Sequence, residues 1–218
     1  MDEDFGAFSP LFEKSGGYLA LLHLGGGAEE VKRVKECVQS AVDAQRDVVA
    51  LLQDLNWRPT LVACVAALFM KGDETVVATL WNRLDSGSWV VPQIAVTLAR
   101  VDPKFMTNAR ARLLAHCPVN GSVLRGMTVS ERHSAAGPAG LVGRSAKAAS
   151  ALVWLVGRMM TPPHEEWFER LRASAEHRAL VAEDVDGGGR IAERWERRLT
   201  EILAAMELAD DVGPQLSS

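Results

Sequence analysis

The chain has 218 residues, of which 48% are hydrophobic and 24% are charged, and its formal net charge is -4 at pH 7. This composition is typical of a globular protein with its own core, and it excludes a disulfide-stapled miniprotein, a collagen-like fibre and a mostly disordered chain. Aromatic residues make up 6% of the chain. Because strands favour aromatic and β-branched residues in alternation, this scarcity beside abundant Ala, Leu and Val predicts an all-α fold.

The N-terminus is acidic at residues 2–4, where a secretory or mitochondrial targeting segment would be basic. The longest apolar run, Leu61 to Met70, has ten residues, whereas a membrane-spanning helix needs roughly 20. The three cysteines, Cys37, Cys64 and Cys117, are widely spaced among apolar neighbours, which indicates reduced core residues rather than disulfides or a metal site. We therefore expect a cytoplasmic protein without a membrane span.

The first predicted helices lie within residues 1–55. A helix around Tyr18 to Leu24 ends at three consecutive glycines. A long helix is then predicted from Ala28 to Leu55, because apolar or small residues recur at alternating intervals of three and four. This seam consists of Val31, Val34, Val38, Ala41, Val48, Leu52 and Leu55, with Gln45 in the remaining place. The seam either lies against the rest of the domain or pairs two chains in a homodimeric coiled coil with Gln45 as the buried polar residue.

Two segments after this helix resemble each other. Asn56 to Ala63 matches Ser88 to Ala95 with one inserted residue, at a spacing of 32 residues between the tryptophans and 33 between the prolines. Repeats of this length are typical of stacked supersecondary units. In each segment the first polar residue can cap a helix, and the proline lies near the first turn, where a missing backbone donor costs little.

A second helix follows each of these segments. Asp73 to Asp85 is the first, and the pair Asp102-Pro103, a natural helix start, opens the second. The sequence therefore predicts two antiparallel helix pairs in tandem over residues 56–116.

The middle of the chain is basic. Residues 1–99 contain 8 basic and 13 acidic side chains, residues 100–158 contain 9 and 2, and residues 159–218 contain 7 and 13. The nine cations of this basic block are Arg100, Lys104, Arg110, Arg112, Arg125, Arg132, Arg144, Lys147 and Arg158. They either pair with the acidic flanks when the chain folds, or form a docking site for an anionic partner.

Five glycines and Pro138 interrupt the helical pattern between Pro118 and Arg144, which predicts a long basic loop. Helices are expected again from Ser145 to about Met160, from Thr161 to about Val181, and from Arg190 to Leu208. We thus expect a single all-α domain of about eight or nine helices over residues 1–218. Its parts are the N-terminal helices in 1–55, the two helix pairs in 56–116, the loop in 117–144 and the C-terminal helices in 145–209.

The tryptophan–proline segments at Trp57/Pro59 and Trp89/Pro92, each followed by two helices, resemble the HEAT-like family of α-helical repeat proteins. The resemblance covers residues 56–116 well and 145–208 loosely. It implies a curved solenoid of antiparallel helix pairs with a concave surface that usually binds protein. Small bacterial HEAT-like proteins include toxin-neutralising immunity proteins and a group of DNA glycosylases.

Two segments resemble catalytic or nucleotide-binding motifs but lack a residue or a spacing that the motif requires. His164-Glu165-Glu166-Trp167-Phe168 begins like a zinc-protease motif, but Phe168 stands where the second histidine ligand is required. Gly137 to Ser145 resembles a phosphate-binding loop, but its spacing is wrong and Arg144 replaces the lysine. We therefore predict no metal, no cofactor and no catalytic residues.

The leading hypothesis is a non-enzymatic protein-binding module on the HEAT-like scaffold, in one concrete form a bacterial immunity-type protein. Its partner presents an acidic surface, which the cations fix by charge-assisted hydrogen bonds while a tryptophan supplies the apolar anchor. The predicted binding residues are Trp89, Arg110, Arg112, Arg125, Arg132 and Arg144.

Two alternatives remain open. The same scaffold would bind nucleic acid or excise a base, with the basic block on phosphates and Asp85 or Asp102 acting on an extruded base. A homodimer through the seam of residues 28–55 would instead serve a structural role.

Overall fold

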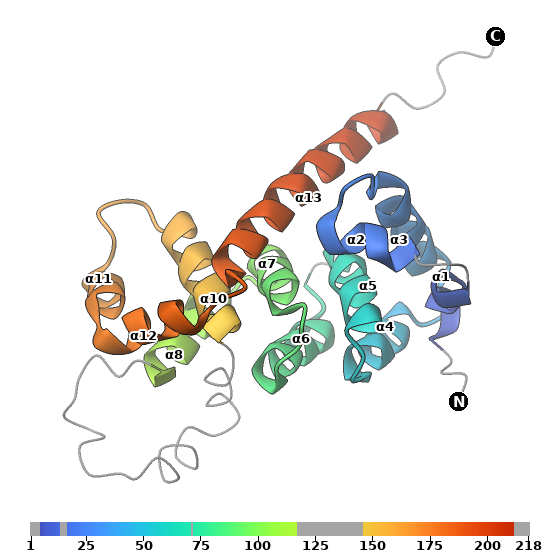
Figure 1. Ribbon diagram of the computed structural model, residues 1–218. Coiled ribbons are helices and arrows are strands. Elements are labelled where there is room, and N and C mark those ends of the chain that lie inside the picture. Colours follow the sequence, from blue (N-terminus) through green and yellow to red (C-terminus); the bar gives the residue numbers. More distant parts are fainter. Residues whose placement is uncertain (1–4, 14–16, 71, 117–145, 212–218) are drawn as a thin grey trace.

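The structure is a computed structural model that describes residues 5–13, 17–70, 72–116 and 146–211. The described residues form helices and no strand, so the predicted all-α fold is confirmed (Figure 1). The predicted loop of residues 117–144 lies outside the described residues.

The N-terminal helices are the 3₁₀ helix η1 (Gly6–Phe8), α1 (Pro10–Glu13), α2 (Gly17–His23), α3 (Ala28–Ser40) and α4 (Ala44–Gln53). The central helices are α5 (Trp57–Leu68), α6 (Glu74–Ser86), α7 (Val91–Val101) and α8 (Phe105–His116). The C-terminal helices are α10 (Ala146–Met159), α11 (Glu166–Ala173), α12 (Ala175–Glu183) and α13 (Gly188–Asp211).

The predicted long helix from Ala28 to Leu55 is wrong, because the chain breaks between α3 and α4. Ala41 adopts an extended conformation, and the side chain of Asp43 accepts a hydrogen bond from the backbone N–H of Arg46, which caps α4. Asp thus favours a new helix start over continuation of the old one.

The seam of that predicted helix faces the core of its own chain. Val31, Val34 and Val48 are fully buried, whereas Val42 in the break is fully exposed. Gln45 is exposed and donates to the Asp73 carboxylate at 2.9 Å instead of filling a buried register position. The buried members of the seam therefore pack within one chain, whereas Leu55, its last member, is 88% exposed.

Of the predicted helix starts in residues 56–116, those at Asn56 and Asp73 are confirmed, whereas Asp102 is the C-cap of α7 and α8 begins only at Phe105. The side chains of Asn56 and Asp73 accept backbone N–H bonds in the first turns of α5 and α6. Ser88 does not cap α7, since its N-cap is Val90, which has no side-chain acceptor. Pro92 lies in the first turn of α7, as expected.

The predicted helix from Thr161 to Val181 is two helices. α11 begins only at Glu166, and Ser174 ends it in an extended conformation and caps α12 by accepting from the N–H of His177. As at Asp43, a side chain that caps the backbone starts a new helix within a helical pattern.

The central helices pack mainly on helices other than their predicted partners, because α5 and α6 both contact α4 and α7 more than they contact each other. α5 packs against α7 and α7 against α10, while α4 packs against both α5 and α6. α5 is buried on all sides from Pro59 to Leu68, which explains why its sequence is apolar from Leu61 to Leu68. α13 crosses α7 and α10 and extends past α2 (Figure 1).

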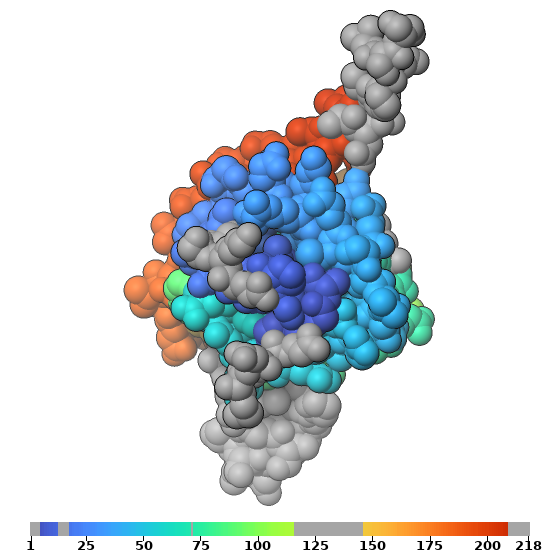
Figure 2. Space-filling model, turned by 90° about the vertical axis from the view of Figure 1, so that its right-hand side faces the viewer, coloured from blue at the N-terminus to red at the C-terminus, as the bar shows by residue number. Residues whose placement is uncertain are grey.

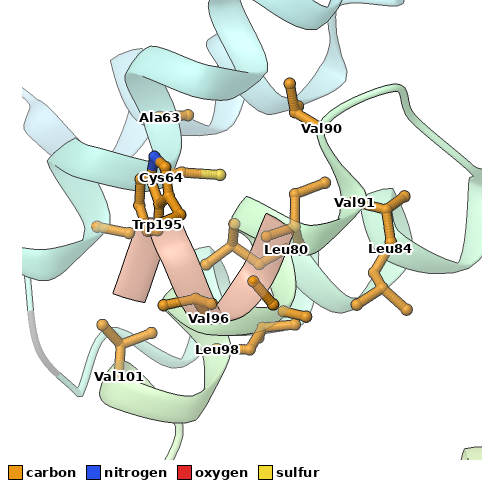
Figure 3. Packing of buried hydrophobic residues seen from close by; sticks show 14 of the residues in the cluster. Ala63, Cys64, Leu80, Leu84, Val90, Val91, Val96, Leu98, Val101 and Trp195 are labelled. Atoms are coloured by element: carbon orange, nitrogen blue, oxygen red, sulfur yellow. The ribbon is translucent and has the colours of Figure 1, made fainter. Parts of the chain in front are cut away.

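One hydrophobic cluster runs through the described helices. Figure 3 shows the part where α5, α6 and α7 meet Trp195 of α13. The side chain of Thr97 on α7 donates to the backbone carbonyl of Cys64 on α5 at 3.2 Å, which satisfies a buried hydroxyl group.

The N-terminal helices are fastened to the rest of the chain through the end of α2. The Trp195 indole donates to the Leu21 carbonyl at 2.9 Å, Gln93 to Leu22 at 3.3 Å and Arg198 to His23 at 2.6 Å. These side chains satisfy the carbonyl groups that a helix C-terminus leaves without partners. Figure 2 shows the N-terminal helices covering this end of the molecule, with α13 along its edge.

Among the described residues, none of the helices combines the length and the apolar character that crossing a bilayer requires.

Candidate protein-binding surface

Trp89 lies on the surface, in the connection between α6 and α7, with 58% of its area exposed. The connection turns at Gly87, whose φ of 79° is in the region that favours glycine. The next residues, Val90 and Val91, are fully buried. The valines therefore anchor the connection in the core and hold the indole outside it.

Trp89 is the exposed end of a row of rings, the aromatic stripe, formed by Tyr18, Trp57 and Trp89. The ring centroids of Tyr18 and Trp57 are 6.0 Å apart and those of Trp57 and Trp89 are 5.2 Å apart, both edge to face. Each such contact stabilises by about 0.5–1.5 kcal/mol beyond area burial. The two tryptophans hold matching positions in the similar segments, so the packing of α5 against α7 brings them together.

Cations border the aromatic stripe. The exposed guanidinium of Arg58 lies 5.5 Å from the ring centroids of both Tyr18 and Trp57. The Lys147 ammonium lies 5.6 Å from the Trp89 ring and 3.1 Å from the Asp186 carboxylate. Lys147 is the second residue of α10. The start of α10 therefore lies beside Trp89.

Arg110 of α8 is on the surface but engages a different part of the molecule. Its side chain is 49% exposed and lies 3.6 Å from the Glu165 carboxylate. Its guanidinium also lies 5.0 Å from the centroid of the Trp167 ring. The Trp167 contact joins α8 to α11, and the Glu165 contact joins α8 to the residue that precedes α11.

Arg112 is a structural residue rather than a surface one. Its side chain is 13% exposed and binds the buried Asp85 carboxylate through two nitrogens, at 2.9 and 2.7 Å. Its guanidinium lies 4.1 Å from the Trp81 ring centroid. Burial raises the pKa of Asp85, and the hydrogen bonds and charge of Arg112 act in the opposite direction.

The other three predicted arginines, Arg125, Arg132 and Arg144, lie outside the described residues. Of the cations of the basic block within the described residues, five form ion pairs with carboxylates of the acidic flanks. These pairs are Arg100–Glu196, Arg110–Glu165, Arg112–Asp85, Lys147–Asp186 and Arg158–Glu196. The interpretation that the block pairs with its flanks is confirmed for these residues.

Asp85 and Asp102, the two carboxylates proposed to act in base excision, both have hydrogen-bond partners within the chain. Asp102 is buried and accepts from the Trp81 indole at 2.7 Å and from the Asn108 amide at 2.8 Å, while Asp85 holds Arg112. Both carboxylates are therefore engaged within the fold by neighbouring donor side chains. Within the described part of the chain, no three His, Cys, Asp or Glu side chains group as metal ligands would.

Tyr18, Arg58 and Lys147 were not among the predicted binding residues. Tyr18 and Lys147 each come close to a tryptophan only because helices distant in sequence pack together, whereas Arg58 directly follows Trp57 in α5. The matching positions of Trp57 and Trp89 were the one signal in the sequence, since equivalent residues of stacked repeats tend to meet.

Comparisons of the chain with known protein families, curated proteins and solved structures give no match.

Proposed function

We propose that this chain is a non-enzymatic protein-binding module on a HEAT-like scaffold, with Trp89 as the anchor for a partner that presents an acidic surface. The observation that carries the proposal is the exposed Trp89 ring, held against Trp57 and bordered by Lys147. Trp and Arg dominate binding hot spots because they bury a large area and lose little entropy when already held in place. A bacterial immunity-type protein that neutralises a toxin is one concrete form.

The packing of the central helices supports a HEAT-like solenoid. α5, α7 and α10 form one succession of neighbours, and α4 and α6 form a second beside it. The hydrogen bond from Thr97 to Cys64 joins residues 33 positions apart, the spacing of the repeated prolines. Stacked repeats produce such contacts between equivalent helices.

An acidic partner fits the cations around the aromatic stripe. Arg58 lies over its rings, and Lys147 at its end directly follows the segment that contains Arg125, Arg132 and Arg144. Cations around a hydrophobic anchor accelerate association with an acidic surface and fix the orientation of the complex. Arg112 has no part in this proposal, because it is committed to Asp85.

A pull-down from native lysate tests the proposal with three baits: the wild-type chain, Trp89→Ala, and Leu208→Ala as a matched control. Leu208 is also an exposed apolar side chain, but it lies near the far end of α13. Each lysate is divided into a nuclease-treated and an untreated half, and bound protein and nucleic acid are identified. We expect an acidic protein that survives nuclease, binds the wild-type and Leu208→Ala baits, and is lost with Trp89→Ala.

The same experiment separates the nucleic-acid alternative. Recovery that disappears with nuclease, or nucleic acid bound equally by the wild-type and Trp89→Ala baits, would overturn the proposal. A protein partner captured equally by all three baits would contradict the role of Trp89. Replacing Arg125, Arg132 and Arg144 together with Glu is expected to abolish capture of the acidic partner without lowering the melting temperature.

A further inference from the structure

The C-terminal helices form an open hollow that the predicted function does not use. It has a volume of about 680 Å³ and is lined by residues of α10, α11, α12 and the start of α13. This volume is within the range of about 300–1,000 Å³ typical of small-molecule sites. We call it the C-terminal pocket.

The pocket has an aromatic wall. Trp154 of α10 and Phe168 of α11 line it, and Phe168 is almost fully buried. Gly157 allows this arrangement, because a Cβ atom there would lie 3.1 Å from the Phe168 ring. Gly189 similarly lets α13 approach α10, since its Cβ would lie 3.3 Å from the Ser150 carbonyl. A flat apolar group would find two rings to pack against.

The rim of the pocket is basic. Arg158, Arg172 and Arg190 line it together with one acidic residue, Asp184. The Asp184 carboxylate is committed to the start of α13, where it accepts from the backbone N–H groups of Gly187 and Gly188 at 3.1 and 2.6 Å. The guanidinium groups therefore outnumber the acid at the pocket.

Two of these arginines are available to a ligand. Arg158 is held by Glu196 at 2.8 Å, but Arg172 approaches Glu169 only to 3.9 Å, beyond hydrogen-bonding distance. Arg190 folds over Gly187, where a Cβ atom would meet its Nε at 2.6 Å. Arg172 comes from α11 and Arg190 from α13, so their side chains reach the pocket from two different helices.

The pKa of His177, which lines the pocket, depends on its surroundings there. Burial lowers the pKa of its imidazole, and the positive charge of Arg172 lowers it further. Burial disfavours charge of either sign, so only the contribution of Arg172 favours an anion over a cation at the pocket.

We propose that the C-terminal pocket binds a small amphipathic anion, a carboxylate or phosphate monoester carried on a flat apolar group. The apolar group packs against Trp154 and Phe168, and the anionic group accepts hydrogen bonds from Arg172 and Arg190. Guanidinium groups suit both head groups, because their planar donors match two oxygens at once. This site is independent of the proposed protein-binding function.

Calorimetric titration with 2-naphthoate, 1-naphthyl phosphate and the neutral 2-naphthalenemethanol tests this proposal. We expect at least one anion to bind with a Kd below about 1 mM, and the neutral probe at least about tenfold more weakly. The stronger anion identifies the preferred head group. The Trp154 indole N–H signal, assigned with Trp154→Phe, is expected to shift on binding.

Three variants locate the site. Arg172→Met combined with Arg190→Met is expected to weaken anion binding about tenfold or more. Val181→Trp places a large ring at an exposed residue of the pocket lining and is expected to block binding. Arg33→Met, an exposed arginine of α3, is the matched control and should bind like the wild type. All three should keep the wild-type melting temperature, since these side chains are exposed.

Equal affinity for the neutral and anionic probes would overturn the proposal. Unchanged anion binding by the double arginine variant, or no binding of either anion to the wild type, would do the same.

Discussion

At the scale of single residues, the pair of Asp85 and Arg112 joins a buried carboxylate to one arginine. The carboxylate is 5% exposed, and the arginine that pairs with it covers Trp81. A buried carboxylate is tolerated only while its partner remains, because the cost of removing it from water is then offset. This is why Arg112 serves the fold although the sequence alone suggested a binding residue.

Replacing Arg112 with Met is expected to lower the free energy of unfolding by about 3–5 kcal/mol at pH 7. Burial already raises the pKa of Asp85 above its ordinary value of 3.8, and loss of Arg112 raises it further. The folded variant then binds the proton more tightly than the unfolded chain, so its stability deficit shrinks as the pH falls from 7 towards 4. Urea denaturation at several pH values measures this change.

The double variant Asp85→Leu, Arg112→Met is the control for this prediction, and it should recover most of the lost stability because no charge is left buried. A deficit in Arg112→Met that stays constant with pH would show that lost packing on Trp81, not the stranded carboxylate, dominates.

Cys64 is a second residue whose chemistry follows from burial. Its thiol is fully buried, and desolvation raises its pKa to about 12. In a variant with Cys37 and Cys117 changed to Ser, iodoacetamide at pH 8 should alkylate Cys64 no faster than the chain unfolds. Mass spectrometry over time, with the urea-unfolded variant as the positive control, measures the rate. Rapid alkylation of the folded protein would contradict the buried position of Cys64.

At the scale of elements, the break between α3 and α4 depends on one capping residue. Asp43→Ala is expected to lower the free energy of unfolding by about 1 kcal/mol, because α4 loses its N-cap acceptor. Lys32→Ala on the exposed side of α3 is the control and should change it by less than about 0.5 kcal/mol. Thermal denaturation compares the two variants. An equal effect of both would show that the Asp43 cap contributes nothing.

The same break shows what the sequence could and could not predict about the fold. Periodicity correctly placed α2, α6, α10 and α13 within a few residues, because a buried helical face leaves a strong pattern. The pattern continued through Asp43 because α3 and α4 face the same core, and it continued through Ser174 although α12 has no buried residue. There a side-chain hydrogen bond to the backbone decided the outcome.

The candidate sites were predictable only in part. The tryptophan spacing pointed to Trp89, but the commitment of Arg112 to Asp85 joins α6 to α8 and has no local signal. The C-terminal pocket was not predicted at all. Its lining comes from four helices. The prediction of one continuous helix from 161 to 181 left no turn at Ser174, and this turn is what lets α12 fold back beside α11.

At the scale of the whole molecule, α13 connects parts that are far apart in sequence. It packs on α7 and α10, and Trp195 and Arg198 hold the end of α2. The N-terminal helices therefore depend on the C-terminal helix for the hydrogen bonds of their carbonyl groups. A chain connected in this way is expected to unfold in one cooperative step, as the prediction of a single domain requires.

Trp195→Phe tests this connection. The substitution keeps an aromatic ring but removes the indole donor, which leaves the Leu21 carbonyl without that hydrogen bond in the core. We expect the free energy of unfolding to fall by about 1–3 kcal/mol, in one transition seen equally by circular dichroism and fluorescence. Trp154→Phe, at a partly exposed tryptophan, is the control and should have a smaller effect. Two separate transitions in the wild type would instead divide the chain into independent domains and contradict the role of α13.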